Sequence, residues 1–265
     1  MLSKPSPGRR TLVSVVIPSR TQPDQGRFLA RSIGSIRAQL LDRDVDFEVI
    51  VSLDRGAAVP QAEGLGRTRF AESQGQGQAA ALNAGAAVAG GDYLAFLEDD
   101  DEWHPEKTRY ALGVLERCDF VSSTQLEVDE SGQALKVNDF PTPSGWFMPI
   151  ESWRLIGGFD TSYRWHLDNE WLGRLGDSRL RRLHLVEGNS LKDSKILSNR
   201  PHLLQCLRAG GPNVQLCGHP LDMPLVRRMV HAGSGMGQIE RNESAQAQAR
   251  AEGHRLIDRF QRFPW

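Results

Sequence analysis

Residues 91–107 constrain the fold of this chain more than any other stretch. Five apolar residues, 93–97, are typical of a buried strand. They run directly into five consecutive acids, 98–102, and Pro105 then suits the first turn of a helix. Carboxylates this close together repel one another, and a bound Mg²⁺ or Mn²⁺ would offset the repulsion. A solvated acidic turn is the alternative, but the strand and the following Trp-x-Pro-x-Lys sequence favour a metal site.

The composition is that of an ordinary globular protein. The 265 residues are 39% hydrophobic and 25% charged, enough for one large α/β domain or two small ones. A net charge of −1 gives no indication of nucleic acid as a partner. We expect a cytoplasmic protein, because there is no apolar signal core or membrane-spanning run, and Cys118, Cys206 and Cys217 lack metal-ligand spacing. Peripheral association with a membrane remains open.

Hydrophobic periodicity predicts alternating strands and helices. The β-branched run at 12–18, an amphipathic helix at 27–41 and a second buried strand at 47–53 form a parallel βαβ unit. Further strands are expected near 69–71, at 119–128 and at 179–186, with a hairpin return at 133–137. Helices are expected at 78–89 and 105–117, from Asp168 onward, at 201–208 and 221–230, and at 240–263.

Several short motifs follow one another in order between residues 12 and 185. They are Val-Val-Ile-Pro-Ser-Arg at 15–20, an acid at 54, Gln-Ala-Ala-Ala-Leu-Asn-Ala-Gly at 78–85, Glu-Asp-Asp-Asp at 98–101, Gly-Gly-Phe-Asp at 157–160 and Asp-Asn-Glu at 168–170. In this order they resemble the family 2 glycosyltransferases with the GT-A fold. The resemblance implies an α/β protein with a Rossmann-like mixed sheet flanked by helices. It also implies an inverting transferase that moves a sugar from a nucleotide diphosphate, with a UDP-sugar as the expected donor, to a carbohydrate or other hydroxyl acceptor.

The same resemblance suggests a division of the chain. Residues 1–11 are expected to be a mobile tail, and 12–186 a catalytic domain with a nucleotide-binding half (12–103) and an acceptor half (104–186). Residues 187–265 would form a C-terminal helical extension that governs the acceptor.

In the nucleotide-binding half, the resemblance assigns roles to residues at strand ends and at one helix. The residues that would contact the nucleotide sugar are Pro18, Ser19, Arg20, Asp54, Gln78, Asn83, Asp99 and Asp100. Asp100 would ligate Mn²⁺ or Mg²⁺, and Glu98 would be a direct ligand or support one. Asp101 and Glu102 are expected to be solvated or to lie at the start of the next helix. For Asp54 the alternative is a residue that caps a turn, although its place at a strand end favours nucleotide binding, and Asn83 could equally be a structural helix residue.

In the acceptor half, Asp168 occupies the position of the general base, with Glu170 in reserve. Alone, Asp168 would be a helix N-cap candidate. Trp146 and Trp165 are expected to line the acceptor cleft, because an indole face stacks on the apolar face of a sugar; core packing is the alternative. His184 or His202 could supply a further metal ligand, although a lone histidine is more often structural.

Two other functions fit parts of this pattern. A nucleotidyltransferase that makes an activated sugar would carry a Gly-rich phosphate loop after the first strand, and residues 18–24 do not match one. A non-catalytic subunit that binds nucleotide or sugar would need neither Asp100 nor Asp168, and both are present.

Overall fold

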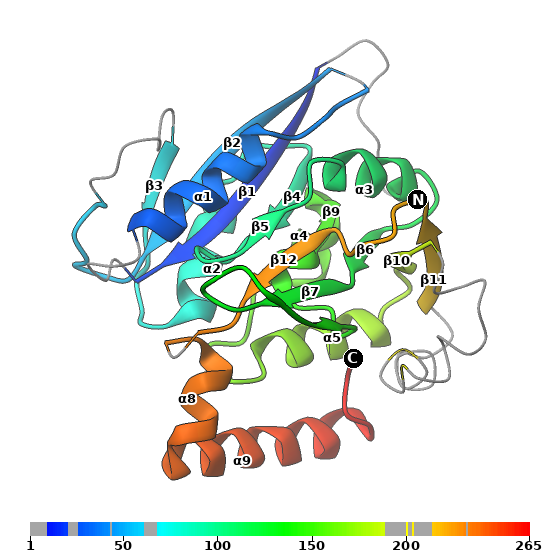
Figure 1. Ribbon diagram of the computed structural model, residues 1–265. Helices are drawn as coiled ribbons and strands as arrows, with labels where there is room; N and C mark the ends of the chain where they lie inside the picture. Colours follow the sequence, from blue (N-terminus) through cyan, green and yellow to red (C-terminus); the bar gives the residue numbers. More distant parts are fainter. Residues whose placement is uncertain are drawn as a thin grey trace.

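The computed structural model describes residues 10–20, 26–42, 44–60, 68–188, 200, 203, 214–231 and 233–265. Two sheets organise them (Figure 1). The larger has eight strands in the order β11-β10-β6-β9-β4-β1-β2-β3. These strands are β1 (Thr11–Ser19), β2 (Val45–Leu53), β3 (Thr68–Glu72), β4 (Tyr93–Phe96), β6 (Phe120–Ser123), β9 (Phe147–Pro149), β10 (Arg182–Glu187) and β11 (Val214–His219).

The larger sheet is mixed because of one strand. Strands β3, β2, β1 and β4 pair in parallel, as do β6, β10 and β11, whereas β9 is antiparallel to both of its neighbours β4 and β6. In register, Val13 lies opposite Phe47 on one side and Tyr93 on the other. The carboxyl ends of β1, β2 and β4 therefore meet at one edge of the sheet, where α/β proteins bind ligands.

Helices cover both faces of this sheet. They are α1 (Gly26–Arg37), α2 (Gln78–Val88), α3 (Lys107–Leu115), α4 (Ile150–Ile156), α5 (Leu167–Asp177), α8 (Gly235–Arg241) and α9 (Glu243–Phe260). Alternate residues of β1 face opposite cores: Val15 packs in the cluster that includes α1 and α3, whereas Val16 packs with α2, α4, α5 and α9. Helix α2 lies close to the sheet because Gly85 has no side chain; a Cβ there would be 2.2 Å from Ser52 Oγ.

The smaller sheet brings distant parts of the chain together. Its order is β5-β12-β7-β8, with β5 (Glu102–Trp103), β7 (Gln125–Val128), β8 (Ala134–Asn138) and β12 (Val226–Met229). Strand β5 follows directly after the acidic run, and β12 pairs antiparallel with it. This pairing places the C-terminal part of the chain beside the acids.

The observed elements confirm most of the predicted ones and correct three. The strand expected at 119–128 is two strands, β6 and β7, which belong to different sheets. The helix expected at 221–230 is wrong, because this segment contains strand β12. The helix expected at 240–263 is divided between α8 and α9 at Asn242, whose side chain accepts the Ser244 and Ala245 N–H groups as an N-cap.

Residues 187–265 are more than a helical extension, since β11 joins the larger sheet and β12 the smaller. The possible helix at 201–208 lies outside the described residues except for Leu203, and the expected tail at 1–11 outside them except for the last two. Within the described part of the chain, no helix is both long and apolar enough to cross a lipid bilayer.

Candidate active site

The edge formed by the ends of β1, β2 and β4 collects most of the polar residues expected there. Ser19, at the end of β1, is buried and hydrogen-bonds to Asp99. Gln78 begins α2 and donates from Nε2 to Glu98 Oε1 at 2.9 Å. Asp54 follows β2 and accepts the Gly77 N–H at 3.0 Å. Arg20 is exposed, and its charge offsets a small part of the rise that burial and Asp100 cause in the pKa of Asp99.

Two other residues of the expected nucleotide site are placed differently. Pro18 lies within β1 opposite Ser52 and is half-buried. Asn83 uses both ends of its amide on the Phe159 backbone, because Nδ2 donates to the carbonyl at 2.9 Å and Oδ1 accepts the N–H at 2.8 Å. Asn83 therefore holds the Gly-Gly-Phe-Asp segment against α2. This is a structural role, the alternative considered for Asn83 from the sequence.

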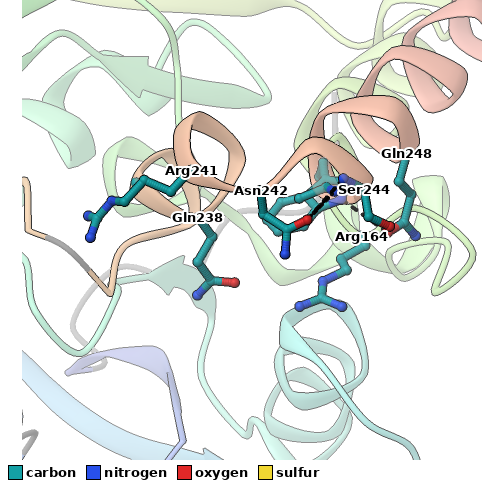
Figure 2. A pocket seen from close by; sticks show the side chains of 9 residues that line it. Arg164, Gln238, Arg241, Asn242, Ser244 and Gln248 are labelled. Atoms are coloured by element: carbon teal, nitrogen blue, oxygen red, sulfur yellow. Dashed lines mark hydrogen bonds between the residues drawn. The ribbon is translucent and has the colours of Figure 1, made fainter.

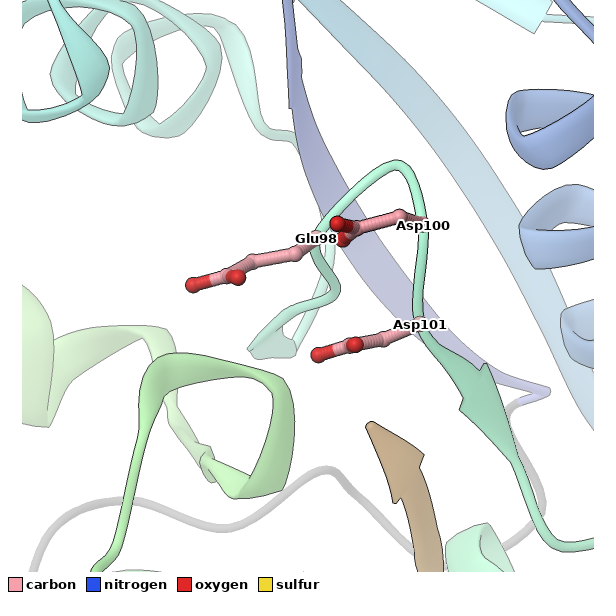
Figure 3. A group of neighbouring side chains, drawn as sticks. All are labelled: Glu98, Asp100 and Asp101. Carbon is pink, nitrogen blue, oxygen red and sulfur yellow. The ribbon is translucent and has the colours of Figure 1, made fainter. Parts of the chain in front are cut away.

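Three acids form a compact cluster on the turn after β4 (Figure 3). One carboxylate oxygen each from Glu98, Asp100 and Asp101 lies within 4.8 Å of the others. Asp101 is fully buried, so the expectation that it is solvated is wrong. Its Oδ2 accepts the Ser144 hydroxyl at 2.6 Å and its Oδ1 accepts the Met229 N–H of β12 at 3.0 Å.

The electrostatics of the cluster would suit a bound cation. Burial, followed by the neighbouring charge of Asp100, raises the pKa of Asp99 to about 7 and the pKa of Asp101 well above its usual range. Burial and Asp100 also raise the pKa of Glu98. Carboxylate oxygens are the donors that Mg²⁺ and Mn²⁺ prefer, so the residues present suit such an ion.

Strand β12 and the residues after it supply two positively charged or protonatable side chains that sequence reasoning missed. Arg228 donates to Glu127 Oε1 at 3.0 Å, and the pKa of this arginine is raised by Glu98, Asp101 and other acids against the effect of burial. His231 Nε2 lies 2.9 Å from Asp100 Oδ2, and this hydrogen bond raises the pKa of His231. The pairing of β12 with β5 and β7 brings both to the cluster.

The histidine that lies beside the acid cluster is His231, and neither of the two that were expected there is placed at it by the structure. His184 is buried in β10, hydrogen-bonds to Ser122 at 2.8 Å and packs against the Trp265 ring. His202 lies outside the described residues. His231 is positioned to orient Asp100: the Gly233 N–H donates to Nδ1, so Nε2 carries the proton of the neutral ring and donates it to the carboxylate.

Asp168 lies in the first turn of α5 and belongs to the same electrostatic site. Its negative charge contributes to the raised pKa of Glu98, and burial raises the pKa of Asp168 itself, while His166 and Arg228 act against that rise. Glu170 is not available as a reserve base. It is buried and forms ion pairs with Arg174 at 2.8 Å and Arg259 at 2.9 Å.

The segment that leads into α5 is held by α9. The carboxylate of Glu252, itself buried, accepts the backbone N–H groups of Arg164, Trp165 and His166 at 2.8–3.1 Å. Helix α9 lies below α5 at the base of the view in Figure 1. Asp168 thus begins a helix whose entry is fixed by a second helix from the C-terminal part of the chain.

The two tryptophans expected in a cleft have different environments. Trp146 has no exposed surface; it packs against Phe96, Phe120 and Trp171, and its Nε1 donates to the Pro141 carbonyl. The expectation that Trp146 lines an open cleft is therefore wrong. Trp165 is partly exposed and lines a pocket of about 410 Å³ (Figure 2).

We call this cavity the C-terminal pocket. Its lining residues are Arg164, Trp165, Gly237, Gln238, Arg241, Asn242, Ser244, Ala245 and Gln248. They come from α8, α9 and the segment before α5. The C-terminal pocket therefore adjoins the segment that carries Asp168.

Comparison with known sequences gives one family. The sequence model of the family described as glycosyl transferase family 2 matches residues 14–169 of this chain. An uncharacterized glycosyltransferase of Nostoc sp. is 30% identical over an alignment of 165 residues, which covers 53% of this chain and 49% of that protein. The amylovoran biosynthesis glycosyltransferase AmsB of Erwinia amylovora is 33% identical over an alignment of 108 residues, which covers 35% of this chain and 36% of AmsB. The chain thus spans about half or less of the length of these relatives.

Comparison with solved structures gives the same fold class. Staphylococcus aureus TarS in complex with UDP superposes with a TM-score of 0.53 at 10% identity, over 94% of this chain and 72% of that one. The mannosyltransferase PcManGT from Pyrobaculum calidifontis, in complex with GDP-Man and Mn²⁺, gives a TM-score of 0.56 at 14% identity, over 95% and 66% of the two chains. At these identities the likeness shows the α/β architecture of a GT-A glycosyltransferase.

Proposed function

Because the chain belongs to glycosyl transferase family 2, we propose that it transfers a sugar from a nucleoside diphosphate to a hydroxyl acceptor with inversion, assisted by a divalent cation and with Asp168 as general base. The observation that carries the proposal is the cluster of Glu98, Asp100 and Asp101 at the end of β4, where one carboxylate oxygen of each lies within 4.8 Å of the others. The charge of Asp168, in the first turn of α5, adds to the effects of burial and of Asp100 that raise the pKa of Glu98. A base and a cation site on either side of one reacting sugar are what such a transfer needs.

The donor would bind beyond the ends of β1, β2 and β4. Asp99 Oδ2 is buried, and no side chain or backbone group of the described residues hydrogen-bonds to it, which suits an acceptor for a ribose or sugar hydroxyl. Ser19 and Arg20 flank Asp99, and Asp54 and Gln78 line the same edge. We propose a UDP-sugar as the donor. The complexes of TarS with UDP and UDP-GlcNAc support it, and the GDP-Man complex of PcManGT makes a guanine donor the competing outcome.

Glu98 and Asp100 would hold the cation, Mn²⁺ or Mg²⁺. When bound, it would neutralise the charge that develops on the departing diphosphate. His231 orients Asp100, and Asp101 with its two hydrogen bonds fixes the turn between the acids and β12. Arg228 adds a fixed positive charge whose field reaches Glu98, Asp100 and Asp101.

The transfer itself is a single displacement. The acceptor oxygen forms a bond to the anomeric carbon while the bond from that carbon to the phosphate oxygen breaks, and the departing oxygen keeps the electron pair. The proton of the acceptor hydroxyl passes to the Asp168 carboxylate. Burial raises the pKa of Asp168, which makes it a stronger base than an exposed aspartate. Attack and departure on opposite faces convert an α-linked donor into a β-linked product.

Replacing the base tests the mechanism. Asp168→Asn retains the shape but cannot accept the proton, so transfer should fall by about 10²–10⁴-fold while binding of the nucleotide, measured by calorimetry, persists. Asp177→Asn, at the exposed other end of α5, is the matched control and should transfer at the wild-type rate. An α-linked product from an α-linked donor, assigned by NMR, would contradict single displacement.

Replacing the metal ligand tests the cation site separately. Asp100→Ala should abolish Mn²⁺-dependent donor binding and leave the fold intact, as judged by circular dichroism. Glu98→Gln should have a smaller effect, because an amide oxygen remains at the position. Full activity with unchanged metal dependence in Asp100→Ala would place the cation elsewhere.

A further inference from the structure

We propose that the C-terminal pocket binds an anionic saccharide unit of the acceptor, a sugar that carries a carboxylate or a phosphate. The inference rests on the proposed function, because it treats the ligand of this pocket as the molecule whose hydroxyl reaches Asp168. The pocket volume of about 410 Å³ lies within the range of roughly 300–1,000 Å³ typical of small-ligand sites.

The charge of the lining residues favours an anion. Two of the nine are arginines, Arg164 and Arg241, and none is an aspartate or glutamate. The chain as a whole has a net charge of −1, so this surface departs from the average of the molecule. Guanidinium groups bind carboxylates and phosphates through paired, charge-assisted hydrogen bonds.

The uncharged lining residues favour a sugar. Trp165 offers an indole ring, which suits the apolar face of a pyranose. Its Nε1 donates to Gln248 Oε1 at 3.2 Å, which fixes the plane of the ring, and the Arg164 guanidinium lies 4.7 Å from the centre of the ring. A ligand that stacks beside Trp165 therefore meets a positive charge at the same place.

The amides of the pocket are already oriented by the protein. Asn242 Oδ1 accepts N–H groups of α9, and Gln248 Oε1 accepts Trp165 Nε1, so each of these amides is held with its oxygen toward the protein. Gln238 Nε2 donates to the Gly233 carbonyl, so this amide is held by its nitrogen. Figure 2 shows Gln238, Asn242 and Arg164 around one hollow. Side-chain amides both donate and accept hydrogen bonds, which matches the hydroxyls of a sugar.

The position of the pocket connects it to the reaction. Trp165 and Asp168 are three positions apart in the chain, so their Cα atoms lie at most about 11 Å apart. Glu252 fixes the backbone of residues 164–166, just before Asp168. A saccharide unit held beside Trp165 can thus present a hydroxyl of a neighbouring unit to Asp168 without a movement of the loop.

Binding of three small probes to the full-length protein tests the proposal. Methyl β-D-glucuronide, glucose 6-phosphate and methyl β-D-glucoside would be titrated by NMR into protein that contains UDP and Mn²⁺, where no sugar transfer occurs. We expect at least one anion to bind about tenfold or more tightly than the neutral glucoside, which corresponds to one charge-assisted hydrogen bond. The anion that binds more tightly identifies carboxylate or phosphate as the group recognised.

Variants place the effect in this pocket. Arg164→Gln and Arg241→Gln should each weaken the preferred anion about tenfold, whereas Trp165→Leu should weaken all three probes. Arg250→Gln removes an exposed arginine from the same helix α9 but outside the lining, and should leave the affinities unchanged. Equal binding of the neutral glucoside, or arginine variants that bind as the wild type does, would overturn the proposal.

Failure of this inference differs from failure of the proposed function. If the wild type transfers sugar to neutral acceptors and the arginine variants do the same, the pocket assignment is wrong and the transferase stands. If the anion binds in an arginine-dependent way but Asp168→Asn hydrolyses and transfers like the wild type, the pocket stands and the catalytic assignment is wrong.

Discussion

At the scale of single residues, Ser144 shows how one hydroxyl organises the acid cluster. Its Oγ donates to Asp101 at 2.6 Å and accepts the Glu98 N–H at 3.0 Å, and its carbonyl accepts Trp103 Nε1 at 2.9 Å. Ser144 is fully buried, so water cannot replace these hydrogen bonds. The cluster is therefore held by a residue that carries no charge and lies far along the chain from the acids.

Removing this hydroxyl should weaken the cation site without removing a proposed ligand. We expect Ser144→Ala to reduce Mn²⁺ affinity about 10–100-fold, the loss typical when a partner of a metal ligand is removed. Ser131→Ala, in the exposed turn between β7 and β8, is the control. Calorimetric titration with Mn²⁺ measures the effect, and an unchanged affinity would show that Ser144 serves only the fold.

The residues that could be predicted from sequence are those that carry a local signal. Asp100 and Glu98 stand in an acidic run at a strand end, and both belong to the observed cluster. Asp101 belongs to the same run, but the hydroxyl and the strand that bury it come from elsewhere. His231 lies in a Gly-rich stretch with no motif, and Trp146 looks solvent-facing beside Gly145; only tertiary packing decides both.

At the scale of elements, the contact between α5 and α9 fixes the entry to the helix that carries Asp168, the proposed general base. Phe260 packs directly on Gly173, where a Cβ would lie 2.6 Å from the ring. The ion pair of Glu170 with Arg259 and the hydrogen bonds to Glu252 tie the same two helices together. The close approach of α9 thus depends on a position without a side chain.

Gly173→Ala should force the helices apart. We expect a loss of about 1–3 kcal/mol in the free energy of unfolding from overpacking, together with slower transfer as the segment before Asp168 shifts. Gly113→Ala is the matched control, because Gly113 lies inside helix α3 with nothing within 4 Å of the added Cβ. This control should stabilise the protein by about 0.5–1 kcal/mol in denaturant titrations. Equal effects at both positions would contradict the role of the contact.

Pairing between distant strands explains why some elements were mispredicted. Strands β1, β2 and β4 are apolar runs buried on both faces, and they were predicted from that pattern. The sequence Val-Arg-Arg-Met of β12 carries no such run, and it is a strand because β5 and β7 pair with it on both sides. Residues 119–128 read as one strand because a single residue, Thr124, links the two strands, with no Gly, Pro, Asn or Asp between them to mark a turn.

At the scale of the whole molecule, buried histidines make the stability of the fold sensitive to acid. Burial lowers the pKa of His184 to about 3 and the pKa of His219 to about 4. In the unfolded chain a histidine has a pKa of about 6.5, so between the two values the unfolded state binds more protons. The stabilising contribution is therefore complete above about pH 6.5 and is lost as the pH falls toward the folded values.

His184→Gln should reduce this dependence on pH. Between pH 6 and pH 4, the free energy of unfolding of the variant should fall less steeply than that of the wild type, by up to about 1.4 kcal/mol per pH unit. His254→Gln, at an exposed position of α9, should leave the slope unchanged. Urea titrations at several pH values measure both, and parallel curves for wild type and His184→Gln would refute the assignment.

The hydrogen bond between Asp100 and His231 spans 131 positions of the chain. At synthesis rates of roughly 5–20 residues per second, about 7–26 s pass between the emergence of the two side chains from the ribosome. During that interval β5 has no β12 to pair with, and the charge of Arg228 is still absent from the acids. The nascent polypeptide can build strands β1, β2 and β4 early, but it gains a complete charge balance at the acids only after β12 has been made.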